Sequence, residues 1–218
     1  SRAIDLIKRC ADSGANAAKF QNFRAETIAS DLGFKNLNGK KSHQANWGKS
    51  VYEVYNEASI SLEWSNKLKE ECEKAGIDYF TAPYDIDLID QLDKFVSAWK
   101  IGSGDITWHE LIEILSKKDK PVLIASGAST MQDVKDAMKI LTSNKSEIVL
   151  MQCNTNYTGS IENFKYVNLS VLKTFKKEFP NVILGLSDHT PGNSTTLGAI
   201  SLGARVIEKH FTDDVTRE

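Results

Sequence analysis

Two histidines near the carboxyl end of the 218-residue chain each follow a short apolar segment. His189 comes two residues after Ser187, and His210 comes two residues after Glu208. Side chains alternate across a strand, so the two residues of each pair share a face. If the two segments are neighbouring strands, their tips lie about 5 Å apart, so we expect the two imidazoles to be close to each other. There they would bind a divalent metal and leave positions open for substrate and water, unless each is an ordinary hydrogen-bonded histidine.

Two lysines also stand at the ends of apolar segments. Lys19 and Lys100 would point into the mouth of a barrel, which is costly unless they meet an anion or form a Schiff base. Ser103 and Ser126 each lie next to a glycine, and their hydroxyl and amide groups suit phosphate or carboxylate oxygens. A snorkelling or salt-bridged lysine is the alternative at both positions.

Neutral polar side chains stand at other strand ends. Gln21, Thr155 and Tyr157 would fit the hydroxyls or the amide of a sugar. His43 and His109 have no comparable partner, and we expect them on the surface or in loops.

The elements that must position these residues alternate regularly between helices and short apolar runs. Such alternation predicts a parallel sheet. One polar stretch, 24–55, contains glycines and little periodicity, which is typical of a long functional or mobile connection. The expected strands are 15–20, 77–83, 98–101, 121–125, 148–153, 182–186 and 206–210, and the expected helices are 4–11, 61–74, 87–95, 108–116, 131–141, 162–178 and 194–202.

The positions of the polar residues distinguish between two architectures that are built on parallel strands. A doubly wound sheet needs a glycine-rich turn after an early strand, and none is present. Polar residues instead follow nearly every strand, which favours a (β/α)8 TIM barrel with its site at the carboxyl ends of the strands. Seven strands cannot close that barrel, and the chain begins in a helical pattern at Ser1. We therefore expect a single catalytic domain over 1–218, a fragment that lacks the first strand.

Composition excludes several classes of protein. The chain is 41% hydrophobic and 26% charged, with 27 basic and 29 acidic side chains, so its formal net charge is 27 − 29 = −2. This balance argues against binding of nucleic acid or membrane surfaces, and the apolar runs are too short to span a bilayer. Cys10, Cys72 and Cys153 form no CxxC pair, so we expect reduced, packed thiols in a cytoplasmic protein.

Four strings make the chain resemble one family, the sialic acid synthases. They are KFQ (19–21), KIGSGD (100–105), GLSDHTPG (185–192) and IEKHFT (207–212). Their order is that of the family, and the resemblance spans essentially the whole chain. Members condense phosphoenolpyruvate with N-acetylmannosamine or a related 2-acetamido sugar, and they release phosphate and a nine-carbon 2-keto sugar acid.

The resemblance implies roles for individual residues. His189 and His210 match the family's metal ligands, which usually serve Mn²⁺, although two imidazoles also tolerate Co²⁺, Zn²⁺ or Fe²⁺. Asp105 stands where many members have Glu, and we expect either it or a carboxylate on the strand before Ser1 to orient the water. Lys100 is expected to act as a second catalytic residue. The positions that match phosphoenolpyruvate contacts are Lys19, Lys100, Ser103, Ser126 and Ser187, and those that face the sugar are Gln21, Thr155 and Tyr157.

The family pattern also has parts that this chain lacks. A first strand would precede Ser1, and a small antifreeze-like domain, which completes a partner's site, would follow Glu218. We therefore expect a homodimer of the full-length protein.

Two other functions and several acceptors stay open at this point. A class I aldolase would use Lys100 or Lys19 as a Schiff-base nucleophile, and a non-catalytic barrel would bind a phosphosugar without turnover. N-acetylmannosamine, its 6-phosphate and diacetamido sugars leading to legionaminic- or pseudaminic-type products all suit the barrel. The 24–55 stretch follows the strand of Gln21, so we expect it to influence this choice.

Overall fold

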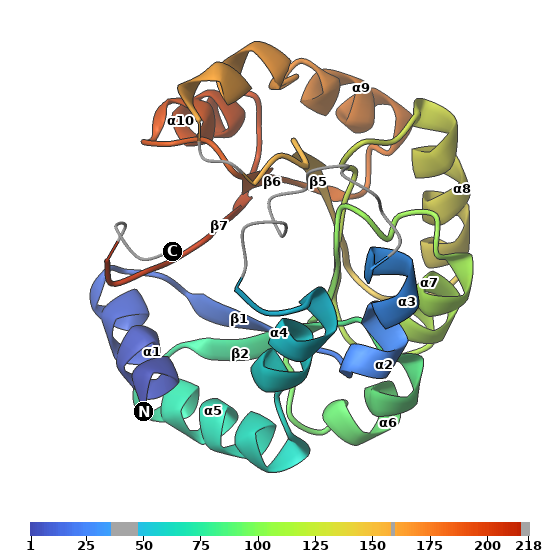
Figure 1. Cartoon of the computed structure of the whole chain (residues 1–218). Helices are drawn as coiled ribbons and strands as arrows, with labels where there is room; N and C mark the ends of the chain where they lie inside the picture. The colour runs from blue at the N-terminus through green and yellow to red at the C-terminus, as the bar shows by residue number, and fades with distance from the viewer. Residues whose placement is uncertain (36–47, 158–159, 215–218) are drawn as a thin grey trace. The chain divides into compact units, whose positions relative to one another are not determined.

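The computed structural model describes residues 1–35, 48–157 and 160–214. The chain forms two compact units, Ser1–Val96 and Ser97–Glu218. Helices and parallel strands alternate in both units, as in the (β/α)8-barrel class predicted from the sequence (Figure 1). Among the described residues, no helix has both the length and the apolar character needed to cross a membrane.

The first unit contains one pair of parallel strands, β1 and β2, with Lys19 opposite Phe80. Helix α5 packs beside β2, and its first turn is capped by Ser61, whose side chain accepts a hydrogen bond from the Trp64 amide. The elements are α1 (Arg2–Asp12), β1 (Ala17–Asn22), α2 (Ala25–Ile28), α3 (Asp31–Lys35), α4 (Val51–Ala58), α5 (Leu62–Lys74), β2 (Asp78–Pro83), η2 (Ile86–Leu88) and α6 (Ile89–Leu92).

The described part of the long polar stretch 24–55 contains α2, α3 and the start of α4, helices that the sequence analysis did not list. Helix α4 begins at a reciprocal capping box between Ser50 and Glu53. The Tyr55 ring packs edge-on against Phe23, with centroids 5.3 Å apart. These helices are short, so they show almost no periodicity in the sequence. Residues 36–47, with His43, lie outside the described residues.

In the second unit, strands β3 to β7 are parallel and pair in chain order. All residues of β4 and β5 are buried, as expected for parallel strands covered on both faces. Helices α7 to α10 follow one another along the outside of these strands (Figure 1). The elements are β3 (Trp99–Ile101), α7 (His109–Ser116), β4 (Val122–Ala125), α8 (Met131–Leu141), β5 (Ile148–Cys153), η3 (Ile161–Tyr166), α9 (Val171–Glu178), β6 (Ile183–Asp188), α10 (Ser194–Ser201) and β7 (Val206–Lys209).

Two expected helices differ from those observed. The single helix expected over 162–178 is divided into η3 and α9, because the chain becomes extended at Val167. The helix expected over 87–95 is only η2 followed by one turn, α6. The bounds of α8 and β5 are those predicted.

The register of β6 and β7 positions the predicted metal ligands. Ser187 lies opposite Glu208, and Asp188 lies opposite Lys209. The next residues along the two strands are His189 and His210, so both histidines stand where their strands end. The carboxyl ends of parallel strands are where a barrel of this class gathers its functional groups.

Candidate active site

The structure brings His189 and His210 together. Their ring centroids are 5.1 Å apart and their planes are inclined by 36°. Two imidazoles bound to one ion through bonds of about 2.1 Å have centroids about 4.5–5.3 Å apart, so this spacing fits a shared divalent metal. The Tyr157 ring lies against both, 4.4 Å from the His189 centroid and 5.8 Å from that of His210.

Backbone contacts orient the His189 ring. Its Nδ1 lies 2.7 Å from the carbonyl oxygen of Asn154, so Nδ1 carries the proton and Nε2 keeps its lone pair. The Cys153 sulfur lies 3.7 Å from the same nitrogen. Burial acts to lower the pKa of His189, but the hydrogen bonds with Cys153 and Asn154 outweigh it and raise this pKa. An Nδ1–carbonyl bond of this kind is the usual support of a metal-binding histidine.

An ion pair ties the two histidine-bearing strand ends together. Lys209 Nζ donates to Asp188 Oδ2 and to the Thr190 carbonyl, both at 2.6 Å. The Asp188 carboxylate, only 1% exposed, also accepts bonds from the Thr190 amide and hydroxyl at 2.9 and 2.7 Å. Burial acts to raise the pKa of Asp188, but the bonds from Lys209 and Thr190 outweigh it, so the pKa is lowered.. The pair therefore adds a side-chain contact between the ends of β6 and β7, whose backbones are paired up to the same two residues.

Lys100 is buried in the second unit, with 2% of its side chain exposed. Its Nζ donates to Glu208 Oε1 at 2.8 Å, and the same oxygen accepts a bond from Ser187 Oγ at 2.9 Å. The sulfur of Met151 lies 3.6 Å from Nζ. The lysine is thus salt-bridged, the alternative that the sequence left open. Glu208 was not among the predicted site residues, although it shares a strand face with His210.

Ser103, Ser126 and Thr155 gather where β3, β4 and β5 end. Thr155 Oγ1 donates to Ser103 Oγ at 2.9 Å. Ser126, which directly precedes Gly127, is also buried. A Cβ atom on Gly127 would lie 2.3 Å from the Ser103 carbonyl oxygen and 2.7 Å from Thr155 Oγ1. Only glycine fits here, also because φ is +54°. The result is a narrow cluster of hydroxyl groups next to backbone amides.

Asp105 follows β3 and is partly buried. Burial raises the pKa of its carboxyl from 3.8 to about 6, because the charged form loses hydration. A carboxyl of this kind gains and loses its proton close to neutral pH, which suits a group that exchanges protons with water.

Replacement of Asp105 by asparagine should therefore stabilise the protein in a pH-dependent way. The folded-state pKa lies above the unfolded value, so ionisation destabilises the fold as pH rises from about 4 through about 6. The variant should exceed the wild type by less than about 0.5 kcal/mol at pH 3.5 and by up to about 3 kcal/mol above pH 7. Urea unfolding across this range measures the difference, with the exposed Asp119→Asn as control. A difference that does not change with pH contradicts the assignment.

Two predicted substrate contacts lie in the first unit. Lys19 is half-buried on β1, and Gln21 at the exposed end of the same strand donates a long bond of 3.4 Å to the Tyr84 hydroxyl. Their contact with a substrate stays a prediction.

The comparison with family sequences decides the affiliation. The sequence model of the NeuB family matches residues 6–218. The chain belongs to the NeuB family. Relatives of this NeuB-family chain include the N,N'-diacetyllegionaminic acid synthase of Campylobacter jejuni, 32% identical over 97% of this chain and 63% of that protein. The N-acetylneuraminate-9-phosphate synthase of Homo sapiens is 30% identical over 99% of this chain and 58% of that protein. The family resemblance predicted from the sequence is thus confirmed.

Solved structures show the same fold. The N-acetylneuraminic acid synthetase of Leptospira borgpetersenii, crystallised with citrate, aligns with a TM-score of 0.81 at 28% identity, over 98% of this chain and 68% of that one. A truncated 3-deoxy-D-arabino-heptulosonate 7-phosphate synthase of Thermotoga maritima aligns with a TM-score of 0.69 at 13% identity, which concerns the fold alone. The NeuB-family chain spans about three fifths of the length of the curated relatives it matches.

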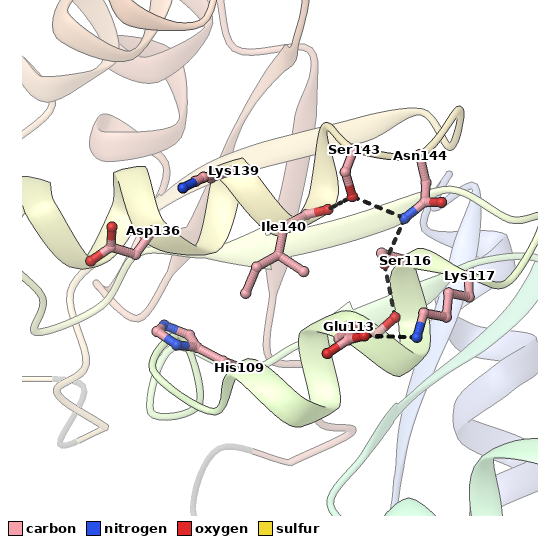
Figure 2. Close-up of a pocket in the computed structure, with 9 residues that line it drawn as sticks. All are labelled: His109, Glu113, Ser116, Lys117, Asp136, Lys139, Ile140, Ser143 and Asn144. Atoms are coloured by element: carbon pink, nitrogen blue, oxygen red, sulfur yellow. Dashed lines mark hydrogen bonds and ion pairs between the residues drawn. The ribbon is translucent and has the colours of Figure 1, made fainter.

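The second unit of this NeuB-family chain also has a groove away from the strand ends. An open groove of about 600 Å³ runs between α7 and α8 (Figure 2). Its polar groups largely satisfy one another: Lys117 Nζ binds Glu113 at 2.7 Å, and Asn144 Nδ2 donates to Ser116 Oγ at 2.9 Å. None of the predicted site residues lines it. Size alone therefore does not make it the reaction site, and His109, at its edge, has the peripheral place expected for it.

Proposed function

We propose that this NeuB-family protein condenses phosphoenolpyruvate with a 2-acetamido sugar. The observation that carries the proposal is the approach of His189 and His210 to 5.1 Å, in the same unit as the buried Lys100. The names of the relatives, which are synthases of legionaminic and neuraminic acid derivatives, support the same substrate class. Because the chain spans only part of these relatives, the proposal concerns the whole protein.

In the proposed reaction one carbon–carbon bond forms and one carbon–oxygen bond breaks. C3 of phosphoenolpyruvate attacks the aldehyde carbon of the open-chain sugar. Water adds its oxygen to C2, and the bond from C2 to the phosphate oxygen breaks. One water proton ends on the former aldehyde oxygen and the other on the released phosphate. The products are a nine-carbon 2-keto sugar acid and inorganic phosphate.

Lys100 and the serines suit the two anionic ends of phosphoenolpyruvate. An ammonium group has three donors, and Glu208 Oε1 takes one of them. We propose that the positive charge of this ammonium group and the Ser103 hydroxyl face the carboxylate and phosphate oxygens, and that Ser187 joins them when its hydroxyl turns away from Glu208. The ion pair of Lys100 with Glu208 at 2.8 Å disfavours the Schiff-base chemistry of an aldolase, which needs an unpaired, neutral amine. Ser126 and Lys19 complete the proposed set of contacts.

His189 Nε2 and the His210 ring would hold a divalent metal, which we propose to be Mn²⁺. When bound, such an ion supplies Lewis-acid polarisation of the aldehyde oxygen. In the part of the chain that the structure describes, no group of three His, Cys, Asp or Glu side chains forms a closed metal site. Two imidazoles therefore suit an open site better than a purely structural one.

Neutral hydrogen-bonding side chains are proposed to contact the acceptor sugar, and an acidic side chain is proposed to act on the attacking water. Tyr157, beside both imidazoles, and Thr155 offer hydroxyls to the sugar, and Gln21 is the third proposed contact. Asp105, with its pKa raised to about 6 by burial, is proposed to orient the water and accept its proton.

The proposal includes a cytoplasmic location and a homodimer of the full-length protein. Cys10, Cys72 and Cys153 are free thiols, the state that reducing compartments maintain. Light scattering of the purified full-length protein measures the assembly.

Phosphate release tests the function. Phosphoenolpyruvate and Mn²⁺ are supplied with N-acetylmannosamine, its 6-phosphate or a diacetamido hexose, and each assay is repeated with a chelator. At least one acceptor should give phosphate and 2-keto acid in equal amounts, and the chelator should abolish both. A borohydride-stable lysine adduct would indicate an aldolase instead. Binding of phosphoenolpyruvate without release from any acceptor would indicate a binding barrel.

Loosening the Asp188–Lys209 pair should weaken metal binding without touching a metal ligand. Lys209→Met and Asp188→Asn remove the contact that joins the two strand ends, and loss of such supporting contacts weakens metal affinity about 10–100-fold. Titration with Mn²⁺ measures the affinity, and circular dichroism checks the fold. Lys135→Met, which removes an exposed pair with Glu178, is the control. Equal affinities in folded variants contradict this role.

A further inference from the structure

A second, smaller pocket lies on the helix side of β5. Its volume is about 440 Å³, within the range that holds small molecules. Helices α8 and α9 contribute to its walls, and the neighbouring pair Lys135–Glu178 joins these helices at 3.0 Å. The lining consists of Ser126, Gly127, Ala128, Ser129, Thr130, Met131, Val134, Gln152, Cys153, Asn154, Thr155, Tyr166, Asn168, Val171 and Phe175.

The lining has no charge. Among the described residues that border the pocket there is no Asp, Glu, Lys, Arg or His. Val134, Val171 and Phe175 give it an apolar wall. A charged ligand would lose its hydration here without meeting a counter-ion, so the pocket suits an uncharged molecule with an apolar body.

Gln152 gives the pocket one unsatisfied polar group. Its side chain is 96% buried (4% exposed), and no described residue donates a hydrogen bond to Oε1. Alternation along β5 sends Gln152 to the face opposite Met151 and Cys153, which contact Lys100 and His189. A buried amide oxygen without a donor destabilises the fold, and such groups are rare unless something else satisfies them.

Other polar groups near the rim are already engaged. Ser129 Oγ donates to the Ser126 carbonyl. The Thr130 hydroxyl donates to Asp133 Oδ2 and accepts a bond from the Asp133 amide, forming the cap of α8. Among the described lining residues, Gln152 Oε1 is the buried side-chain atom without a hydrogen bond, so we expect it to select the ligand.

We propose that this pocket is a second small-molecule site, for an uncharged ligand that presents an amide or another N–H or O–H donor to Gln152. The ligand's flat apolar part lies against Val134, Val171 and Phe175. Gln152 and the apolar wall lie on the helix side of β5, whereas Met151 on the other face contacts Lys100. Ser126 and Thr155, two of the proposed substrate contacts, also border the pocket. The inference does not depend on the proposed reaction.

Benzamide is a suitable probe, and benzoate, with the same shape and a negative charge, is its control. In NMR titrations of the protein, benzamide should shift resonances of Val134 and Val171, and benzoate should bind at least ten-fold more weakly. Gln152→Met should weaken benzamide at least ten-fold. The exposed Gln132→Met on α8 should leave its affinity unchanged.

Two further measurements keep the test decisive. Gln152→Met should unfold at the same temperature as the wild type or higher, because it removes the unsatisfied oxygen. His210→Ala should retain benzamide binding, since that ring belongs to the reaction site. The proposal is overturned if benzamide shifts nothing, if benzoate binds equally well, or if Gln152→Met binds benzamide like the wild type. Loss of binding in His210→Ala would assign the pocket to the reaction site.

Discussion

Replacement of His189 by alanine should lower metal-dependent phosphate release by about a thousandfold or more. The variant loses one of two proposed metal ligands, and with it the polarisation that stabilises the developing charge on the aldehyde oxygen. The wild-type ring is oriented by the Asn154 carbonyl at 2.7 Å, and alanine supplies no ligand atom at this position. Phosphate release with phosphoenolpyruvate, the best acceptor and Mn²⁺ measures the effect.

His109 supplies the matched control. It is an exposed histidine on α7, at the groove between α7 and α8 rather than at the strand ends. His109→Ala should keep wild-type turnover and wild-type Mn²⁺ affinity. Full activity of His189→Ala, or wild-type activity in the presence of a chelator, would rule out the proposed metal chemistry.

Replacement of Lys100 by methionine should have the largest effect on stability. The change removes the cation from a buried pair and leaves Glu208, whose side chain is 16% exposed, without its ion-pair partner. Breaking a buried pair by removing one member costs about 3–5 kcal/mol. Phosphoenolpyruvate binding should be lost as well, since the same ammonium is proposed to hold it. Urea unfolding and ligand titration measure the two effects separately.

The double variant Lys100→Met, Glu208→Gln separates stability from binding. Neutralising the second partner removes the buried charge, so most of the lost unfolding free energy should return. Binding of phosphoenolpyruvate should not return, because the cation is still missing. A double variant as unstable as the single one would show that packing of the lysine, and not its charge, stabilises this part of the fold.

Much of the fold and of the candidate site was predictable because it depends on local periodicity. The alternation of apolar runs and helical spacing predicted parallel βα units, and the bounds of α8 and β5 agree with the prediction. Alternation across a strand also placed Ser187 with His189 and Glu208 with His210. Since β6 and β7 pair in register, both histidines stand at neighbouring strand ends.

Other features depend on partners far away in the sequence, and no local pattern carries them. Lys100 and Glu208 are 108 residues apart, and the sequence could not tell a salt bridge from a ligand contact. The need for glycine at 127 comes from the approach of the Ser103 carbonyl, which only the packed strand ends create. The helices near Tyr55 and the break at Val167 were missed because short segments show too little periodicity.

Residue types and their spacing thus determined the βα order, the family and the candidate chemical groups. The tertiary structure alone decided which groups touch: the Asn154 carbonyl that sets the His189 tautomer, the Lys209–Asp188 pair and the unsatisfied Gln152 amide. The physical reason is that periodicity follows from the backbone of one segment. Hydrogen bonds and burial instead depend on which segments meet, and that follows from the free energy of the whole packed chain.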